Sequence, residues 1–431
     1  MFSFLFLRGA VLALLLLCSA AQAAPALTLT LTLAEAQRRA VERSRQLAAQ
    51  DSSVLAAREM AAAAGQLPDP VLRLGVDNLP VDGADQFSLT RDFMTQRRIG
   101  LAQEFTRDDK RQARSARYER EAERAQAEKS ATVAAIQKDT ALAWLDRYYS
   151  EAMVAAGKTQ IGQARLEIEA ADAAYRAGRG SRADVLAARA LLAGLEDKLS
   201  EIERRVHTAK IMLARWVGEV GEVGDVPLAG EPGVDFIALD LDALEAQLAH
   251  HPQIAILGKQ AQLAEAEAQL ARTNRQSDWG VELSYSQRGP LYSNMVSIGV
   301  SVPLQWDRKN RQDRELGAKL ALVEQAKAQR EDALRAHVAE VRAMIVEWQN
   351  GRSRQARYQR ELVPLADERT QAVLAAYRGG KASLAEVLAA RRAETEVRIQ
   401  VLQLRADTAR WWAQLNFLGA ETPGGNKKEQ P

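Results

Sequence analysis

The sequence predicts a mainly α-helical protein with a small β part, in which long antiparallel coiled-coil helices alternate with pairs of short strands. Three observations support this fold class. Ala, Leu, Arg, Glu and Gln dominate the composition while aromatic residues make up only 5%, which is typical of long helices. The chain repeats itself after about 200 residues. Within each repeat, short segments alternate between apolar and polar residues, as half-buried strands do.

The first residues have the features of a secretory signal peptide. Arg8 precedes an apolar run, and Ala21-Gln22-Ala23 supplies small residues where such a signal is cleaved. We therefore expect residues 1–23 to be removed and the mature chain to be exported. Cys18 leaves lipoprotein processing as an alternative, although Leu17 before it is bulkier than a lipid-attachment site prefers. Cys18 is the single cysteine, so cleavage would leave no thiol for a disulfide or a metal.

Charge and hydropathy argue against a nucleic-acid-binding protein and against a protein with membrane-spanning helices. The 58 basic and 56 acidic residues nearly balance and are spread along the chain, so no nucleic-acid surface is predicted. After the signal, no segment has the roughly 20 consecutive apolar residues that a membrane-spanning helix needs. If this chain enters a membrane, it must do so as strands.

The repeat is clearest in two matching segments, 174–189 and 376–391. Each contains a tyrosine, then glycine, serine, an acidic residue, Val-Leu and a final arginine, at a constant offset without a gap. A match of this length indicates a tandem duplication. We therefore look for every structural feature in pairs.

Each repeat has the order helix, two strands, very long helix, turn, helix. The first repeat (24–217) is predicted to contain a helix over Leu33–Gly65, a β-hairpin (71–105) with strands Val71–Leu79 and Arg98–Phe105, and helices 108–177 and 181–217. The second repeat (241–418) is predicted to contain a helix over Leu241–Arg272, a β-hairpin (279–304) with strands Trp279–Ser286 and Met295–Leu304, and helices 307–378 and 383–418. A linker (218–240) rich in Gly and Pro joins the repeats, and residues 419–431 form a polar tail.

The last helix of each repeat carries apolar residues at alternating steps of three and four, which is the pattern of a coiled-coil seam. The first seam is Leu192, Leu195, Leu199, Ile202, Val206, Ala209 and Leu213, and the second is Val397, Val401, Leu404, Thr408, Trp411 and Leu415. Helix-on-helix packing is therefore expected throughout.

The strands have one apolar and one polar face. Trp279, Val281, Leu283 and Tyr285 alternate with Gly280, Glu282, Ser284 and Ser286, and the other strands alternate in the same way. A membrane barrel, with apolar residues toward lipid and polar ones toward water, requires this alternation. A soluble sheet covered by a helix on one side would show it too, so both interpretations stay open on the strands alone.

A membrane interpretation requires several copies of the chain. Four strands cannot close a barrel, and open edges are not tolerated in hydrocarbon. Three protomers would supply twelve strands, while dimers or tetramers also satisfy the arithmetic. The long helices of about 70 residues would be rods of roughly 105 Å, which no compact domain needs, and the shorter helices of the first repeat stack to about the same length. A tube of uniform height is predicted.

The chain resembles the TolC-type outer-membrane efflux channels over almost its whole mature length. The resemblance depends on the duplication, on Leu67-Pro68-Asp69-Pro70 before the first strand, and on the paired motif Tyr-x-x-Gly-x-x-Ser-x-x-(Asp/Glu)-Val-Leu-x-Ala-Arg beginning at Tyr175 and Tyr377. It implies a homotrimer with an α-barrel in the periplasm and a twelve-stranded transmembrane β-barrel in outer-membrane lipid. The implied partners are a periplasmic adaptor (membrane fusion protein) and an inner-membrane RND pump.

Residues 77–80 and 87–100 are similar to the heavy-metal efflux (CzcC- and CusC-like) branch, which implies transition-metal cations as cargo. A multidrug or type I secretion duct of the same fold is an alternative, and a soluble periplasmic coiled-coil adaptor or scaffold is a more distant one. An adaptor would carry a domain rich in short strands between its helices, whereas here only two hairpins interrupt them.

The paired motif supplies the candidate site residues. Gly178 and Gly380 can end a helix, and Ser181 with Asp184, like Ser383 with Glu386, has the spacing of a helix-start capping box. Capping alone explains these residues; alternatively, the acids also form a ring that selects cations at the entrance of the tube. By resemblance, Asp184, Tyr377 and Glu386 are the gate candidates. Ala389 and Ala382 stand where the resemblance would place a second acid and an arginine.

No catalytic, cofactor or metal site is predicted. His207, His250, His251 and His337 are the only histidines, and none has an acid or thiol at convincing ligand spacing. His250-His251-Pro252 is interpreted as a turn inside a helical region. Without a nucleophile motif or phosphate loop, the sequence favours a passive duct over an enzyme.

Overall fold

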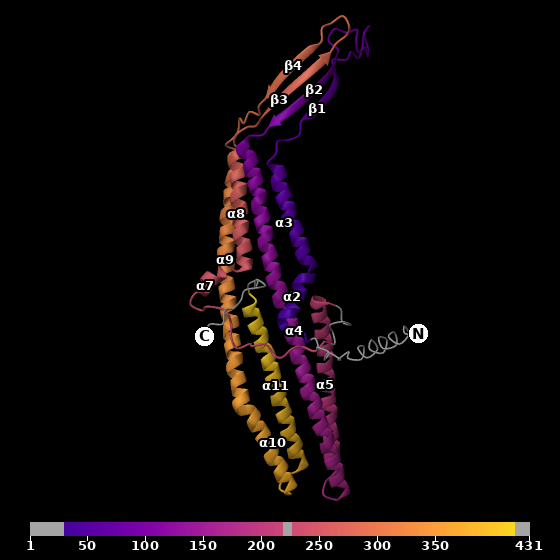
Figure 1. The fold of residues 1–431 in the computed structure, drawn as a ribbon, viewed down its shortest axis with the longest axis vertical. Helices are drawn as coiled ribbons and strands as arrows, with labels where there is room; N and C mark the ends of the chain where they lie inside the picture. Colours follow the sequence, from indigo (N-terminus) through magenta and orange to yellow (C-terminus); the bar gives the residue numbers. More distant parts are fainter. Residues whose placement is uncertain (1–29, 219–225, 419–431) are drawn as a thin grey trace, which may run out of the picture.

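The computed structural model describes residues 30–218 and 226–418. The predicted signal peptide with Cys18, part of the linker (219–225) and the polar tail lie outside the described residues. The molecule is a long rod with a four-stranded sheet at one end and helical hairpins at the other (Figure 1). None of the helices in the described part of the chain is long and apolar enough to cross a membrane.

The helices and strands follow the predicted order. The first repeat contains α2 (Leu33–Arg43), α3 (Arg45–Ala64), β1 (Val71–Asp77), β2 (Gln96–Phe105), α4 (Asp108–Arg176) and α5 (Arg182–Val217). The second contains α7 (Leu244–Leu248), α8 (Pro252–Thr273), β3 (Trp279–Gln287), β4 (Met295–Ser301), α9 (Gln312–Arg357), the π-helix η1 (Tyr358–Leu362), α10 (Val363–Arg378) and α11 (Leu384–Asn416).

Helix α4 runs through most of the helical part of the molecule. Its 69 residues make a rod of about 100 Å, and it packs against α3 and α8 on the sheet side and against α5 and α11 on the opposite side (Figure 1). The predicted seams of α5 and α11 are buried or half-buried at every position, which confirms helix-on-helix packing.

The predicted helix over Leu33–Gly65 is wrong in one respect, because it is broken at Ser44. The backbone of Ser44 is extended, and its hydroxyl accepts a hydrogen bond from the Leu47 N–H at 3.3 Å, so Ser44 starts a new helix. A serine side chain can satisfy the free N–H groups of a helix start, which makes such a break inexpensive. The predicted helix over Leu241–Arg272 is similarly interrupted: α7 ends before His250, and α8 begins at Pro252.

The long helix of the second repeat is neither as long nor as regular as predicted. It begins at Gln312 instead of Asp307, and a five-residue π-helix interrupts it just before Pro364. Proline lacks an N–H and clashes with the carbonyl four residues earlier, so a wider local turn relieves the conflict. The chain changes direction here, between α9 and α10 (Figure 1).

Three tryptophans fix the middle of the rod. The indole N–H groups of Trp144, Trp348 and Trp412 donate to the carbonyls of Leu31 (3.1 Å), Val234 (3.2 Å) and Phe236 (2.8 Å). The largest buried hydrophobic cluster surrounds these rings. The residues before α2 and the linker before α7 are thus held against the long helices, and we call this region the waist.

The four strands form one antiparallel sheet in the order β1-β2-β3-β4. Each repeat contributes one hairpin, and the two hairpins are joined because β2 pairs with β3. In this pairing Leu101 lies opposite Leu283, and Ile99 lies opposite Tyr285. Within the described residues, β1 and β4 each have a free edge.

Candidate channel-forming surfaces

The apolar side chains of the sheet form one continuous face. The register brings Leu72, Leu101, Leu283 and Ile298 into one row, and Leu74, Ile99, Tyr285 and Val296 into the next. The face is open to the surroundings: Ile298 is 75% exposed and Leu74 71% exposed. No helix in the described part of the chain covers it, because the helices lie beyond the end of the sheet (Figure 1). An apolar surface this continuous is a binding surface for lipid or for protein.

The opposite face is polar and lined with charged pairs. Arg73 on β1 reaches across to Glu282 on β3, with 2.6 Å between Nη1 and Oε2, and Arg98 pairs with Asp77 at 3.2 Å. Ser284 and Ser286 lie between them and are buried. At the foot of this face is a cavity of about 680 Å³. This face suits contact with water, as the strand alternation predicted.

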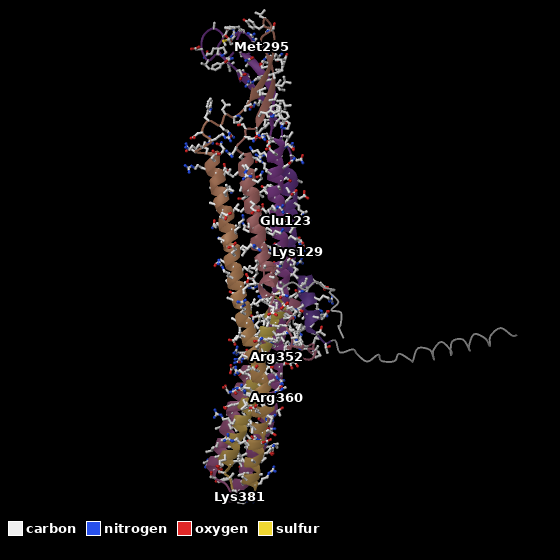
Figure 2. All side chains as sticks on the ribbon, turned by 90° about the vertical axis from the view of Figure 1, so that its left-hand side faces the viewer. Glu123, Lys129, Met295, Arg352, Arg360 and Lys381 are labelled. Atoms are coloured by element: carbon white, nitrogen blue, oxygen red, sulfur yellow. The ribbon has the colours of Figure 1, made fainter. Side chains whose placement is uncertain are left out.

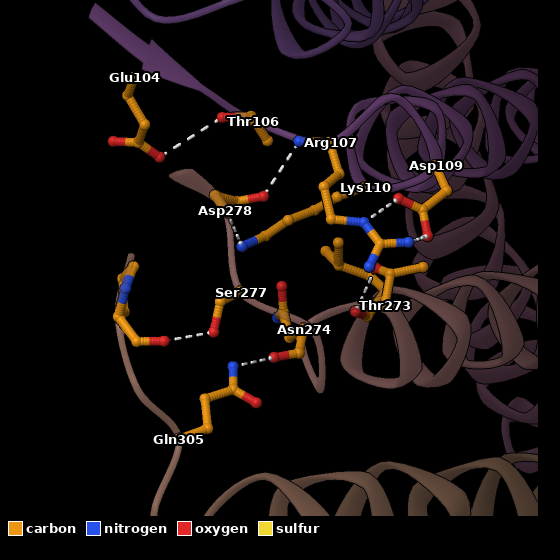
Figure 3. A network of polar contacts seen from close by, with 12 residues as sticks. Glu104, Thr106, Arg107, Asp109, Lys110, Thr273, Asn274, Ser277, Asp278 and Gln305 are labelled. Carbon is orange, nitrogen blue, oxygen red and sulfur yellow. Dashed lines mark hydrogen bonds and ion pairs between the residues drawn. The ribbon is translucent and has the colours of Figure 1, made fainter. Parts of the chain in front are cut away.

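A buried ion pair joins the sheet to the helices (Figure 3). Asp278, just before β3, accepts hydrogen bonds from Lys110 Nζ at 2.6 Å and from the Arg107 N–H at 3.0 Å. Burial opposes ionisation of Asp278, but these hydrogen bonds outweigh it and lower its pKa. The stacked rings of Phe105 and Trp279, 4.6 Å apart, lie beside it. We call this arrangement the joint.

The two predicted tip motifs lie at the far end of the rod from the sheet. Figure 2 shows Lys381, in the second tip turn, at one extreme and Met295, on β4, near the other. The first turn connects α4 to α5, and the second connects α10 to α11.

The two turns share one geometry. Gly178 (φ +69°) and Gly380 (φ +70°) adopt the left-handed conformation that ends a helix without strain only for glycine. Ser181 and Ser383 then start the next helix with a capping box.

The candidate gate acids are engaged in these caps. Asp184 Oδ2 accepts from the Ser181 N–H (2.9 Å) and Oγ (2.7 Å), and Glu386 Oε2 accepts from the Ser383 N–H (2.7 Å) and Oγ (2.9 Å). These hydrogen bonds lower the pKa of both acids, and the bond from the serine backbone N–H has a larger effect than the bond from the hydroxyl. Both are therefore ionised at neutral pH, and each keeps one carboxylate oxygen outside the cap.

Tyr377 has a different environment from the two acids. It is half-buried and packs on a hydrophobic cluster that includes Ala171 of α4, Val185 of α5 and Val387 of α11. All four tip helices meet in this cluster. Among the described residues, Tyr377 makes no hydrogen bond to Asp184, so one protomer alone does not bring these two gate candidates together.

A charged network that sequence analysis missed crosses between the two tip hairpins. Arg391 on α11 contacts Glu167 on α4 (3.1 Å) and Glu394 (3.2 Å), and Glu394 also pairs with Arg398 (2.8 Å). Glu394 is only 3% exposed. Burial raises the pKa of Glu167, against the lowering effect of Arg391. The sequence offered one sign of this network, because Arg391 is the last residue of the repeated motif. Its partners Glu167 and Glu394 lie outside the motif, so the pairing itself could not be predicted.

A groove of about 600 Å³ runs between α5 and α11 above the tips. The groove exists because small residues line it. These are Ala187, Ala190, Gly194, Ala385 and Ala389, and its polar lining residues include Lys198 and Arg392. Ala389, which stands where the resemblance would place a second acid, therefore faces the groove.

The described residues hold no group of three or more His, Cys, Asp and Glu side chains placed to bind a metal ion. His251 is the N-cap residue of α8, in the predicted turn, and His207 and His250 are exposed.

Comparison with known proteins identifies the fold. Residues 243–420 match the family model described as outer membrane efflux protein. No curated protein sequence matches the chain.

Three solved structures illustrate the similarity. The chain is similar to CusC, described as forming a transmembrane channel (15% identity, TM-score 0.77, 90% of this chain and 92% of that one). It is similar to the outer membrane protein VceC of Vibrio cholerae (18% identity, TM-score 0.73, 90% and 97%). It is also similar to the MtrE outer membrane channel of Neisseria gonorrhoeae in its open state (16% identity, TM-score 0.72, 90% and 91%).

The family model matches the second repeat, and the fold of these channel structures extends over nine tenths of the chain. The proteins that the chain resembles are described as efflux proteins and channels, not as enzymes. The fold class predicted from the sequence is confirmed: long helices carry a short sheet in the arrangement of these channels.

Proposed function

We propose that the chain is one protomer of a homotrimeric outer-membrane efflux channel, the exit duct of a tripartite export system. The observation that carries the proposal is the sheet, with an exposed apolar face, a charged opposite face and two free edges. A sheet of this kind is stable in hydrocarbon only when each edge finds a partner. Pairing β1 of one protomer with β4 of the next would satisfy both edges, and three copies would close a barrel of twelve strands.

The rest of the molecule supports a duct. The apolar face would contact lipid, and the Arg73–Glu282 face would line the water-filled lumen. The helices would extend the tube for about 100 Å into the periplasm. The tips would be its inner entrance, where Asp184 and Glu386 from three protomers would form acidic rings that attract cations. Tyr377 would complete the gate through contacts between protomers.

The proposed partners follow from the place of such a duct. A periplasmic adaptor and an inner-membrane RND pump would supply cargo at the tips, and the groove between α5 and α11 is the candidate contact for the adaptor. We further propose transition-metal cations as the cargo, supported by the similarity of residues 77–80 and 87–100 to the heavy-metal branch. Multidrug export or type I secretion through the same duct are the alternatives.

Disulfide trapping tests the trimer. Leu74→Cys on β1 is combined in turn with Val296→Cys, Ile298→Cys and Val300→Cys on β4, in a background with no other cysteine after signal removal. We expect at least one pair to give covalent trimers in isolated outer membranes. As a matched control, Ile99→Cys with Tyr285→Cys, which lie opposite each other within one sheet, should cross-link inside the monomer. Monomers alone from all three test pairs, with an efficient control, would refute the proposed closure.

Growth assays test the cargo. A strain lacking the gene, and the same strain complemented, are compared on zinc, cobalt, cadmium, copper and silver, and on a panel of drugs and dyes. Metal sensitivity restored by complementation supports the metal branch. Sensitivity to drugs alone would contradict the cargo assignment while leaving the channel intact.

A further inference from the structure

A small cavity lies at the waist, away from the sheet and the tips. Its volume is about 180 Å³, and it is bordered by the start of α8, the middle of α9, one face of α4 and the end of α11. His251, His337, Glu340 and Met344 contribute to its lining, together with Lys138 and Gln253. Nothing in the proposed duct function uses these side chains.

Two histidines from different helices meet in this cavity. His251 is 9% exposed and His337 is 8% exposed, and their ring centroids are 4.4 Å apart with the planes tilted by 41°. Nε2 of His337 is buried and lacks a hydrogen-bond partner among the described residues. The ring nitrogens of His251 are buried as well, and the Leu418 backbone is a hydrogen-bonding neighbour of that ring. Buried polar atoms are almost always satisfied, so the unpartnered Nε2 of His337 and the remaining nitrogen of His251 indicate that a ligand belongs in the cavity.

The surrounding groups favour a cation that imidazole can coordinate. On α9, Glu340 is one turn after His337, and its carboxylate lies 3.7 Å from His337 Nδ1. At this distance the carboxylate does not hydrogen-bond to Nδ1, but its negative charge favours a cation near the ring. Met344 follows about one turn later and adds a thioether to the lining of the cavity.

A positively charged side chain also lines the cavity. Lys138 lies on its α4 side, and Asp139, 3.9 Å away, is its counter-charge.

We propose that this cavity is a binding site for a borderline or soft transition-metal cation, with His251 and Nε2 of His337 as its protein ligands. Zn²⁺ and copper ions prefer imidazole nitrogen, and a monovalent d¹⁰ ion also accepts a thioether, so Met344 would be a third ligand for Cu⁺ or Ag⁺ only. Water completes the coordination. Two imidazole ligands give a site weaker than a structural zinc centre. The inference concerns an ion held at the waist and is independent of the cargo of the duct.

Binding measurements on the full-length mature protein, purified in detergent without a histidine tag, test the proposal. Isothermal titration with Zn²⁺, and separately with Ag⁺, should give about one ion per protomer. His251→Gln and His337→Gln should each weaken binding of both ions by about tenfold or more. His250→Gln is the matched control, because His250 is the adjacent residue but is exposed, and it should bind like the wild type. Met344→Leu should weaken Ag⁺ binding and leave Zn²⁺ binding within about twofold.

Two further measurements remove the dependence on variants that fold poorly. Electron paramagnetic resonance of the Cu²⁺-loaded wild type should show coupling to two imidazole nitrogens. Saturating Zn²⁺ should raise the melting temperature of the wild type and of His250→Gln, since a ligand that binds only the folded state stabilises it. No saturable binding, equal affinity in the His251→Gln/His337→Gln double variant and the wild type, or a Cu²⁺ spectrum without nitrogen coupling would overturn the proposal.

Discussion

The joint between sheet and helices gives the sharpest stability prediction. The Asp278–Lys110 pair is 2.6 Å long, and the two side chains are only 10% and 14% exposed. Asp278→Asn removes the negative charge and leaves the Lys110 ammonium buried without a counter-ion. Breaking a buried pair in this way costs about 3–5 kcal/mol. Because the asparagine oxygen can still accept from the Arg107 N–H, we expect the lower end, about 3 kcal/mol.

Asp109→Asn is the matched control at the same joint. Asp109 pairs with Arg107 at 2.7 Å, but the two side chains are 45% and 32% exposed (Figure 3). Solvent screens such a pair, so its loss should cost no more than about 1 kcal/mol. Guanidinium unfolding of both variants, followed by far-ultraviolet circular dichroism at fixed protein and detergent concentrations, measures the difference. An Asp278→Asn cost no larger than that of Asp109→Asn would refute the assignment of the joint.

The same pair predicts a pH dependence. The pKa of Asp278 is lowered in the folded chain, so the folded state favours the carboxylate and its stabilising contribution is complete above the unfolded pKa of about 3.9. The free-energy difference between the wild type and Asp278→Asn should be constant from neutral pH to about pH 5. This free-energy difference should decrease toward zero as the pH falls below about 4, when Asp278 becomes protonated. A difference that closed near neutral pH would contradict this assignment.

Three other predictions concern the tips and the waist. Asp184→Asn combined with Glu386→Gln should raise single-channel conductance or abolish cation block at the inner entrance, and unchanged behaviour in planar bilayers would leave these acids only their capping role. Ser383→Ala should cost about 1 kcal/mol and speed hydrogen exchange in the first turn of α11; equal exchange in both proteins would contradict the cap. Gly351→Ala would place a Cβ against Thr408 Oγ1, closer than van der Waals contact allows, whereas Gly317 on the same helix has open space. The free energy of unfolding should fall by about 1–3 kcal/mol in Gly351→Ala and rise by up to about 1 kcal/mol in Gly317→Ala.

Local patterns in the sequence predicted most of the fold because each has a fixed structural period. The seam of α5, the alternation of β3 and the Ser181 and Ser383 caps all depend on neighbours within a few residues. The break at Ser44 and the π-helix before Pro364 depend on single side chains that compete with an otherwise helical pattern. Propensity summed over a window does not resolve such single-residue competition.

The contacts that the sequence did not predict join residues far apart in the chain. Lys110 and Asp278 are separated by 168 positions, and Glu167 and Arg391 by 224. His251 and His337 likewise come from separate helices, so their spacing shows no ligand motif. A pattern of charges indicates that a helix face is polar, but which helix packs on that face is decided by the tertiary fold. The duplication did not help with the tip network: Arg391 has a counterpart in Arg189, but the position that matches Glu167 is occupied by Arg369.

Lipid exposure of the sheet is the most direct test of the channel. The mature chain should lack cysteine, so single spin labels can be placed at Leu74 and Ile298 on the apolar face and at Arg73 and Ser297 on the polar face. In reconstituted bilayers, the first two labels should be accessible to oxygen and protected from a water-soluble nickel complex, and the second two should show the reverse. Four labels equally accessible to the nickel complex would contradict a barrel in the membrane.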